Sequence, residues 1–414
     1  MPKSKAQCQQ CQSPDLVPIL DLGDQPFSTG LPLRSNEPLR MFDLGLVQCT
    51  ACGLLQLRRP ARATDLTPFV DWVTYREPEA HLDTVCDNLL ALAGMTSTSR
   101  PIFGITSKDD TLLQRLAQRG HSSTRRLDLA TDLGVTRMLA NVEAVPDALT
   151  SIRATAISQQ YGKAQLVICR HIFEHACNLS SFLTGLTGLV APDGYLMLEV
   201  PDCTSSLERR DYTMLWEEHS VYFTPATFFP LLQSHGFDAA LTSIYPYPYE
   251  NCLVLVARKR NVAASADDAQ SRLAESNLAL SQELSVGRAY GASFEAVTQR
   301  LRQHLLAQRA RKPVALYGAG HLTAAFVNYH GLADLIDCVV DDTPQKQGLL
   351  LPGSGLPILP SSALKKRGIG LCLLGLAPET EPKVVQKNKD YVDSGGKFRS
   401  ILAASPSYLL NDHN

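Results

Sequence analysis

Four cysteines in two close pairs form the first group of residues whose spacing suits chemistry. Cys8 and Cys11 are separated by two residues, and so are Cys49 and Cys52. Each pair places two thiolates on one tight turn, and two such turns supply the four soft ligands of a closed tetrahedral zinc site. Gly53 follows the second pair, where a turn of this kind often needs a positive φ. We expect a structural zinc ion, because four protein ligands leave no position for water.

The remaining cysteines and the overall charge limit the setting of this site. The chain has 11 cysteines, an odd number, which favours free buried thiols and metal binding over disulfides. The formal net charge of -2 makes nucleic acid an unexpected partner. No apolar run is long enough to cross a membrane, and the start of the chain has no apolar stretch of a secretory signal. The expected location is therefore the cytoplasm.

The elements that must position the chemistry alternate between strands and helices. Strand patterns cover residues 101–105, 126–129, 165–169, 195–200 and 251–258, and helical patterns cover 81–92, 111–119 and 179–190. Residues 191–194 are expected to form a turn, and the late strand at 251–258 is expected to close the sheet. This alternation predicts a doubly wound parallel sheet. We expect an α/β protein with a zinc module at 1–60, a doubly wound α/β domain at 61–260, a helical linker at 261–311 and a Rossmann-like α/β domain at 312–414.

A glycine turn opens the last part of the chain. The strand Val314 to Tyr317 is followed by Gly318, Ala319 and Gly320 and then by a helical pattern. Backbone amides at such a helix start suit a phosphate group. Asp341 ends the next strand at a spacing that permits a dinucleotide-binding site, although the third glycine of that motif is absent.

Several short motifs follow one another along the chain in a specific order. They are Leu20-Asp21-Leu22-Gly23, Cys49-x-x-Cys52-Gly53-Leu54, Pro192-Asp193-Gly194-Tyr195, Glu199-Val200-Pro201, Glu218-His219-x-x-Tyr222-Phe223 and Tyr317-Gly318-Ala319-Gly320. In this order the chain resembles the sugar C-methyltransferases that act on nucleotide-linked keto-deoxysugars. The resemblance covers nearly the whole chain and implies that residues 61–260 form a class I methyltransferase-like domain. It implies zinc and S-adenosylmethionine as cofactors and a nucleotide-linked sugar as substrate; the oligomeric state stays unknown.

The resemblance also implies a reaction and its residues. A base removes the proton beside the ketone of the sugar, and the resulting enolate takes the methyl group. His219 lies where the family carries its base, and Tyr222 and Tyr75 are candidate hydroxyl donors. Trp216, in place of the family's tyrosine, and Glu218 are candidate substrate contacts. Each of these residues could instead be an ordinary packing residue, as could the Glu174-His175 pair.

The cofactor loop departs from the family pattern. The family has a leading acid and two glycines after its first strand, whereas this chain has Gly104-Ile105-Thr106-Ser107-Lys108-Asp109-Asp110. Gly104, Thr106, Ser107 and Asp109 are the candidate loop contacts. Asp128 follows the second strand and either binds the ribose hydroxyls or caps the next turn.

Three functional hypotheses follow. The first is a C-methyltransferase, in which Gly318, Gly320, Lys346 and Gln347 help to hold the nucleotide-sugar. The second is a non-catalytic relative that binds a nucleotide-sugar or a partner, and the altered loop supports it. The third is an NAD-dependent sugar enzyme that uses the glycine turn Gly318-Ala319-Gly320, supported by Asp341 and its spacing from that turn.

Overall fold

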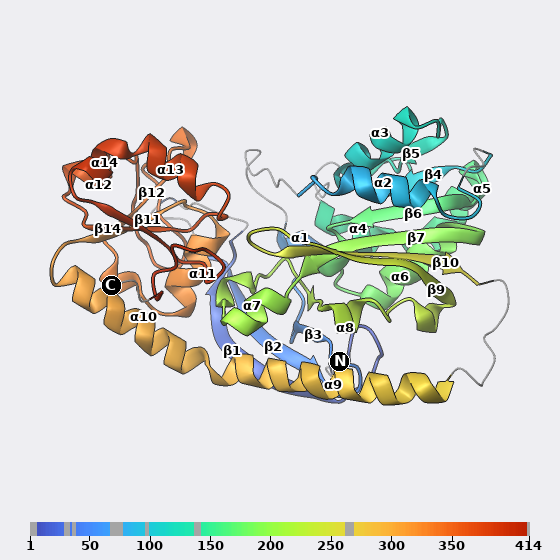
Figure 1. Cartoon of the computed structure of the whole chain (residues 1–414), viewed down its shortest axis with the longest axis horizontal. Coiled ribbons are helices and arrows are strands. Elements are labelled where there is room, and N and C mark those ends of the chain that lie inside the picture. The colour runs from blue at the N-terminus through green and yellow to red at the C-terminus, as the bar shows by residue number, and fades with distance from the viewer. Residues whose placement is uncertain are drawn as a thin grey trace.

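A computed structural model of the chain describes residues 6–28, 34, 39–66, 78–95, 99–135, 142–260 and 269–411. It contains three sheets (Figure 1). Two of them are flanked by helices at opposite ends of the molecule, and the sheet of the zinc module lies between and below them. No helix among the described residues is both long and apolar enough to span a bilayer. Tyr75 belongs to the segment outside the described residues.

The first sheet belongs to the zinc module but recruits one strand from elsewhere. Its antiparallel order is β1-β2-β3-β8, with β1 at Leu16–Pro26, β2 at Met41–Cys49, β3 at Leu55–Leu57 and β8 at Val221–Tyr222. Strand β8 lies 160 residues beyond the expected end of this module, so pairing in space crosses the sequence boundary. Leu44, Leu46 and Tyr222 share one buried cluster on this sheet.

The second sheet has six strands in the order β5-β4-β6-β7-β10-β9. Strands β5, β4, β6 and β7 are parallel, and β10 is antiparallel to both of its neighbours. The sheet bounds are Thr124–Arg126 (β5), Ile102–Gly104 (β4), Ala164–Arg170 (β6), Val190–Asp202 (β7), Asn251–Lys259 (β10) and Phe237–Tyr245 (β9). The main helices are Leu82–Leu90 (α2), Asp110–Gln118 (α3), Ser151–Tyr161 (α5) and Leu179–Leu189 (α6), with short helices at Ala63–Leu66 (α1), Val145–Ala148 (α4), Thr204–Arg209 (α7) and Pro225–Phe228 (α8).

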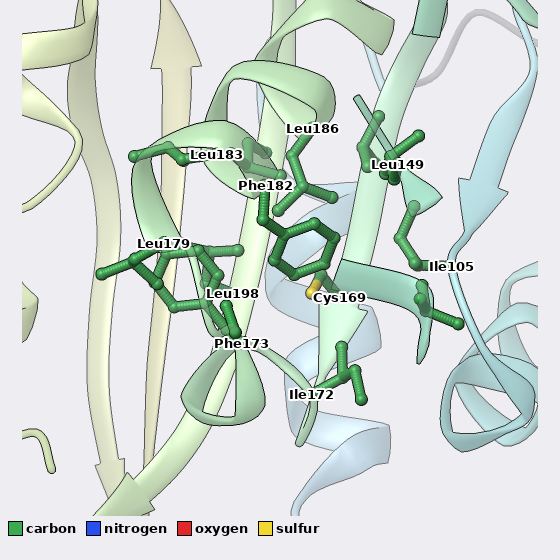
Figure 2. Close-up of a cluster of buried hydrophobic side chains, with 14 of the residues drawn as sticks. Ile105, Leu149, Cys169, Ile172, Phe173, Leu179, Phe182, Leu183, Leu186 and Leu198 are labelled. Atoms are coloured by element: carbon green, nitrogen blue, oxygen red, sulfur yellow. The ribbon is translucent and has the colours of Figure 1, made fainter. Parts of the chain in front are cut away.

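A dense apolar layer joins helix α6 to this sheet. Figure 2 shows the ring of Phe182 at the centre of the layer, close to Cys169 of β6 and flanked by Phe173. All three side chains are fully buried. This layer fixes the strand ends after β6 and β7, where the polar residues described below begin.

Two expectations for this sheet were wrong. The run 191–194 is not a separate turn but part of β7, and Asp193 adopts a φ of 60° there. The register between β6 and β7 shifts at the same place, so the irregularity is absorbed within the ladder. Strand β10 does not close the sheet, because β9 forms the edge beyond it; the mostly exposed pattern of β9 left only a weak apolar signal.

Two helices run along the base of the molecule (Figure 1). They are α9 at Ala269–Ala292 and α10 at Phe294–Arg309. A Cβ atom added to Gly287 would lie 2.3 Å from Gln48 Oε1, and one added to Gly291 would lie 1.9 Å from the carbonyl oxygen of Ile19. Glycine therefore lets α9 approach the zinc module closely, and this segment is a packed strut rather than a free linker.

The third sheet is fully parallel, in the order β13-β12-β11-β14-β15. Its elements are Val314–Tyr317 (β11), His321–Tyr329 (α11), Cys338–Val340 (β12), Ile358–Leu359 (β13), Ala363–Lys366 (α12), Leu371–Leu374 (β14), Glu381–Lys387 (α13), Lys389–Asp393 (α14) and Lys397–Ser400 (β15). This domain has its own buried core.

Candidate active site

The four paired cysteines converge on one point. Their sulfur atoms all lie within 4.8 Å of one another, with Cys8 and Cys52 3.5 Å apart and Cys11 and Cys49 3.6 Å apart. A tetrahedral ion with bonds of about 2.3 Å would separate its sulfur ligands by about 3.8 Å. The thiols therefore fit a zinc ion, which would hold them together as thiolates.

The two turns that carry the cysteines have the same backbone construction. The amide of Gln12 donates to the Cys8 carbonyl, and the amide of Gly53 donates to the Cys49 carbonyl. Both residues have positive φ, 61° at Gln12 and 83° at Gly53, so the expectation for Gly53 is confirmed. Cys52 donates a hydrogen bond that lowers the pKa of Cys8 to about 5, whereas burial raises the pKa of Cys49 to about 11.

The cofactor loop follows β4 and is held by Asp109 instead of glycines. Its fully buried carboxylate accepts hydrogen bonds from the amides of Ile105 (2.7 Å), Thr106 (2.9 Å) and Arg170 (3.0 Å). Burial raises the pKa of Asp109 to about 7, against the opposing effect of these bonds. A Cβ atom on Gly104 would lie 2.8 Å from the Asp109 Cβ. Asp109, at the start of the helix, therefore holds the backbone of this loop in place.

Arg170 ties this loop to the neighbouring strands. Its fully buried guanidinium donates to Glu199 Oε2 at 2.7 Å and to the carbonyl oxygen of Lys108 at 2.5 Å. Burial alone would raise the pKa of Glu199, but hydrogen bonds from His171 and His81 and the charge of Arg170 hold it well below its usual value. The loop after β4 is thus anchored to the ends of β6 and β7.

The strand order places this loop at a switch point. After β4 the chain forms β5 on one side of β4, and it then crosses to form β6 on the other side. Ligands of open α/β sheets bind outside the carboxyl ends of strands at such a point. Thr106 and Ser107 lie there, and so does Asp128 beyond β5. Asp128 caps the next turn through Oδ1, which accepts bonds from Ala130 and Thr131. Asp128 Oδ2 takes part in none of these capping bonds. The position of Thr106, Ser107 and Asp128 therefore fits a site for S-adenosylmethionine.

His219 lies on the loop that leads into β8. The amide of Ser220 donates to the Glu174 carbonyl at 2.8 Å, and the amide of Leu57 donates to the Ser220 carbonyl at 2.9 Å. The loop is therefore fixed between the end of β6 and the zinc module. His219 is partly exposed, whereas Glu174, His175 and Glu218 around it are buried.

Histidine and carboxylate groups gather around His175. Ligand atoms of Glu174, His175 and His219 lie within 4.8 Å of one another, and so do those of Glu143, His175 and Glu218. The rings of His175 and His219 meet edge to face at 4.7 Å. Burial lowers the pKa of His175 well below its usual value, so this imidazole is neutral. The cluster can take up one proton at His219 without creating a pair of adjacent cations.

Two predicted donors already serve other partners. The Tyr222 hydroxyl, fully buried, accepts from the Trp216 amide at 3.0 Å and donates to the Trp216 carbonyl at 3.2 Å. The Trp216 indole N–H donates to Ser28 Oγ at 2.6 Å. Both residues shape the loop that carries His219.

The glycine turn of the C-terminal domain faces this loop. Gly318 and Gly320 lie between β11 and α11, and the His321 ring stacks on Trp216 at 4.7 Å. Lys346 donates to the Ala319 carbonyl at 2.8 Å and pairs with Asp341 at 3.3 Å, and Gln347 donates to the Asp341 carbonyl.

Asp341 does not support the dinucleotide hypothesis. Its Oδ2 accepts from the Ala319 amide at 2.8 Å, and its Oδ1 accepts from the Thr343 amide at 2.8 Å. One carboxylate oxygen thus holds the glycine turn and the other holds the backbone just after Asp341, whereas a dinucleotide site needs this acid for a ribose.

Sequence reasoning missed several residues of the site. Ser28, Glu143, Arg170 and His321 carry no motif, and each contacts the site through folding of distant segments. A charged residue at the end of a strongly apolar strand was the one available signal, and it applies to Arg170.

Three family models match consecutive parts of the chain. Residues 8–66 match a zinc binding domain, residues 108–241 match a methyltransferase domain, and residues 252–402 match a C-methyltransferase C-terminal domain. Together with the doubly wound sheet and the four-cysteine centre, these matches define a methyltransferase that combines a zinc module with a second α/β domain.

The chain resembles one characterised enzyme over almost its full length. It is 26% identical over 406 residues to the C-methyltransferase NovU of Streptomyces niveus, covering 95% of this chain and 94% of that protein. We conclude that the chain is an S-adenosylmethionine-dependent C-methyltransferase related to NovU.

Solved methyltransferases match the middle of the chain more weakly. A 1,6-didemethyltoxoflavin-N1-methyltransferase of Burkholderia thailandensis with bound S-adenosylhomocysteine is 15% identical, with a TM-score of 0.29 and coverage of 44% of this chain and 80% of that one. Magnesium protoporphyrin IX methyltransferase of Synechocystis PCC 6803 with bound S-adenosylmethionine is 16% identical, with a TM-score of 0.27 and coverage of 43% and 77%. These scores are too low to carry a conclusion.

Proposed function

We propose that the chain methylates the carbon beside the keto group of a nucleotide-linked 4-keto-deoxysugar, with His219 as the base. The observation that carries this proposal is the position of His219, partly exposed among buried histidine and carboxylate groups. A proton beside a ketone is acidified, and a base near neutral pKa suits its removal. Bound S-adenosylmethionine would supply the methyl group, held by Thr106, Ser107 and Asp128 beyond the ends of β4 and β5.

The surroundings of His219 support proton uptake. The C–H bond of the sugar breaks, its electron pair passes to the enolate, and the proton moves to His219. Glu174 lies close enough to stabilise the imidazolium, and neutral His175 adds no opposing charge. The enolate carbon would then form the new bond to the methyl group while the methyl–sulfur bond of S-adenosylmethionine breaks, with its electron pair left on sulfur in S-adenosylhomocysteine. Tyr75 remains the candidate donor to the enolate oxygen, since the Tyr222 hydroxyl is bonded to Trp216.

The C-terminal domain is the proposed site for the nucleotide. Gly320 begins α11 without a side-chain cap, and the positive end of a helix favours a phosphate group. This helix start lies beside Trp216 through the stacked His321 ring. Gly318 and Lys346 shape the same turn. A sugar whose diphosphate binds here would extend toward His219, with Trp216 and Glu218 alongside.

Two assays test the proposal. Nucleotide-linked 4-keto-deoxysugars with S-adenosylmethionine should give a product one methyl group heavier, read by mass spectrometry. With S-adenosylhomocysteine in D₂O, the same sugar should exchange its proton beside the ketone, which isolates the base from the transfer. His219→Ala should lower both rates by about 10²- to 10⁴-fold, while binding of S-adenosylmethionine persists.

The control is His235→Ala, on the turn Gln233–His235, where the ring contacts Ser234 and the Leu231 carbonyl. This variant should keep both rates. Normal exchange in His219→Ala would remove His219 from the role of base, and absence of exchange in the unchanged protein with every keto-sugar would refute the substrate class.

A further inference from the structure

One serine of the zinc module reaches the loop that carries His219. Ser28 follows the end of β1 and is only 9% exposed. Its hydroxyl accepts from the Trp216 indole N–H at 2.6 Å and donates to Glu217 Oε1 at 2.6 Å. Its backbone amide donates to the same Glu217 oxygen, also at 2.6 Å. Three hydrogen bonds thus join Ser28 to Trp216 and Glu217, which lie 188 and 189 positions further along the chain.

These bonds act just before His219, and a second anchor acts just after it. Trp216 and Glu217 precede His219, and Ser220 accepts a bond from the Leu57 amide before β8 pairs with β3. The zinc module therefore holds both ends of the five-residue segment from Trp216 to Ser220, whose third position is occupied by buried Glu218. His219 is left with little freedom to move along the chain.

The bond to the indole also sets the ring beside His219. The Trp216 ring lies 5.2 Å from the His219 ring and stacks on His321 of the C-terminal domain. The indole nitrogen can only donate a hydrogen bond. The Ser28 hydroxyl is the acceptor that, together with the stacking on His321, fixes the orientation of the ring. A hydroxyl is suited to the place because it accepts from the indole and donates to the carboxylate at once.

We propose that Ser28 is a positioning residue for the methyl-transfer reaction, acting on His219 through Trp216 and Glu217. The inference rests on the proposed role of His219 as base. The zinc module is then part of the active-site construction, because its first strand delivers the hydroxyl. Ser28 itself touches neither the reacting carbon nor the cofactor in this scheme.

Fluorescence tests the contact without any substrate. The chain has two tryptophans, so in a Trp72→Phe background Trp216 is the single indole. Ser28→Ala in that background should shift the emission to longer wavelength as the ring loses its bond and meets water. Ser13→Ala is the matched control, since Ser13 bonds exposed Asp15 in the same module. Unchanged emission in Ser28→Ala would overturn the proposal.

Kinetics test the consequence. Ser28→Ala should lower kcat by about 10- to 100-fold, as expected for a small displacement of a catalytic group. The dissociation constant of S-adenosylmethionine and the zinc content should stay unchanged. In the plot of kcat against pH, the acid limb should move to a different pH. Ser28→Thr, which keeps the hydroxyl, should restore the rate. Equal losses in both variants, or weaker cofactor binding, would overturn the positioning role. If the unchanged protein methylates no keto-sugar but the emission shift occurs, the proposed function fails while the contact stands.

Discussion

The zinc module and the C-terminal domain both hold the loop of residues 211–222, but they do so in different ways. The zinc module contributes a paired strand and the Ser28 bonds, on a small sheet whose ends depend on the four cysteines. The C-terminal domain contributes a bond from His321 to the Thr213 carbonyl at 3.0 Å and one from Tyr329 to the Leu215 carbonyl at 2.9 Å. It packs its own five-stranded core. The comparison indicates that a metal secures one side of the active site and an apolar core secures the other.

Loss of zinc should give the largest difference in stability between the zinc module and the C-terminal domain. Structural zinc contributes about 10–16 kcal/mol of apparent binding free energy in small domains. Cys49→Ser should therefore lose the metal, unfold β1 to β3 and abolish methyl transfer, with hydrogen exchange rising there and in β8. Strands β11 and β14 should keep their protection.

A thiol outside the centre provides the control for this experiment. Cys338 is buried in β12 and far along the chain from the paired cysteines. Cys338→Ala should keep one zinc per chain by elemental analysis. If Cys49→Ser also keeps its zinc and its exchange protection, the four-cysteine centre is wrong.

Acid should act on the C-terminal side instead. Burial lowers the pKa of His321 and of His330 from 6.5 to about 4. Between these values the unfolded chain binds more protons than the folded one, so stability is complete above pH 6.5 and is lost as the pH falls. Each histidine should remove about 1.4 kcal/mol per pH unit. Hydrogen exchange of peptides from β11 and α11 across this range measures the loss.

His330→Gln removes one of the two titrating groups. The free energy of opening measured by hydrogen exchange should then decrease less steeply as the pH falls. The slope should lose the contribution of one histidine, about 1.4 kcal/mol per pH unit. An unchanged slope would show that His330 is accessible to protons in the folded state.

The bond from Tyr329 should give the smallest effect. Tyr329→Phe leaves the Leu215 carbonyl without this donor, which typically costs about 0.5–1.5 kcal/mol. We expect KM for the nucleotide-sugar to rise several-fold, with the dissociation constant of S-adenosylmethionine unchanged, as measured by calorimetry. Tyr391→Phe, whose hydroxyl donates to the Lys397 carbonyl within the same domain, serves as control. A loss of cofactor affinity in Tyr329→Phe would show that the two sides are not separate.

Some of the site was predictable because its signal is local. The spacing of Cys8, Cys11, Cys49 and Cys52 indicates zinc by itself, because thiolates two residues apart lie on one turn. The strands β4, β6 and β11 were placed within one or two residues by their apolar runs. His219 came from its motif, and only the fold brings His175 and Glu174 beside it.

Apolar patterning and cysteine spacing by themselves determined the α/β class, the zinc ligands and the order of the parts. Only the tertiary structure decided that β8 joins the sheet of the zinc module, that the Asp109 carboxylate holds the backbone of the cofactor loop, and that Ser28 bonds Trp216. The physical reason is that strand pairing and buried hydrogen bonds join groups far apart in the chain. Their partners depend on which polar atoms are left to satisfy when the sheets have packed, and periodicity along one segment carries no record of that.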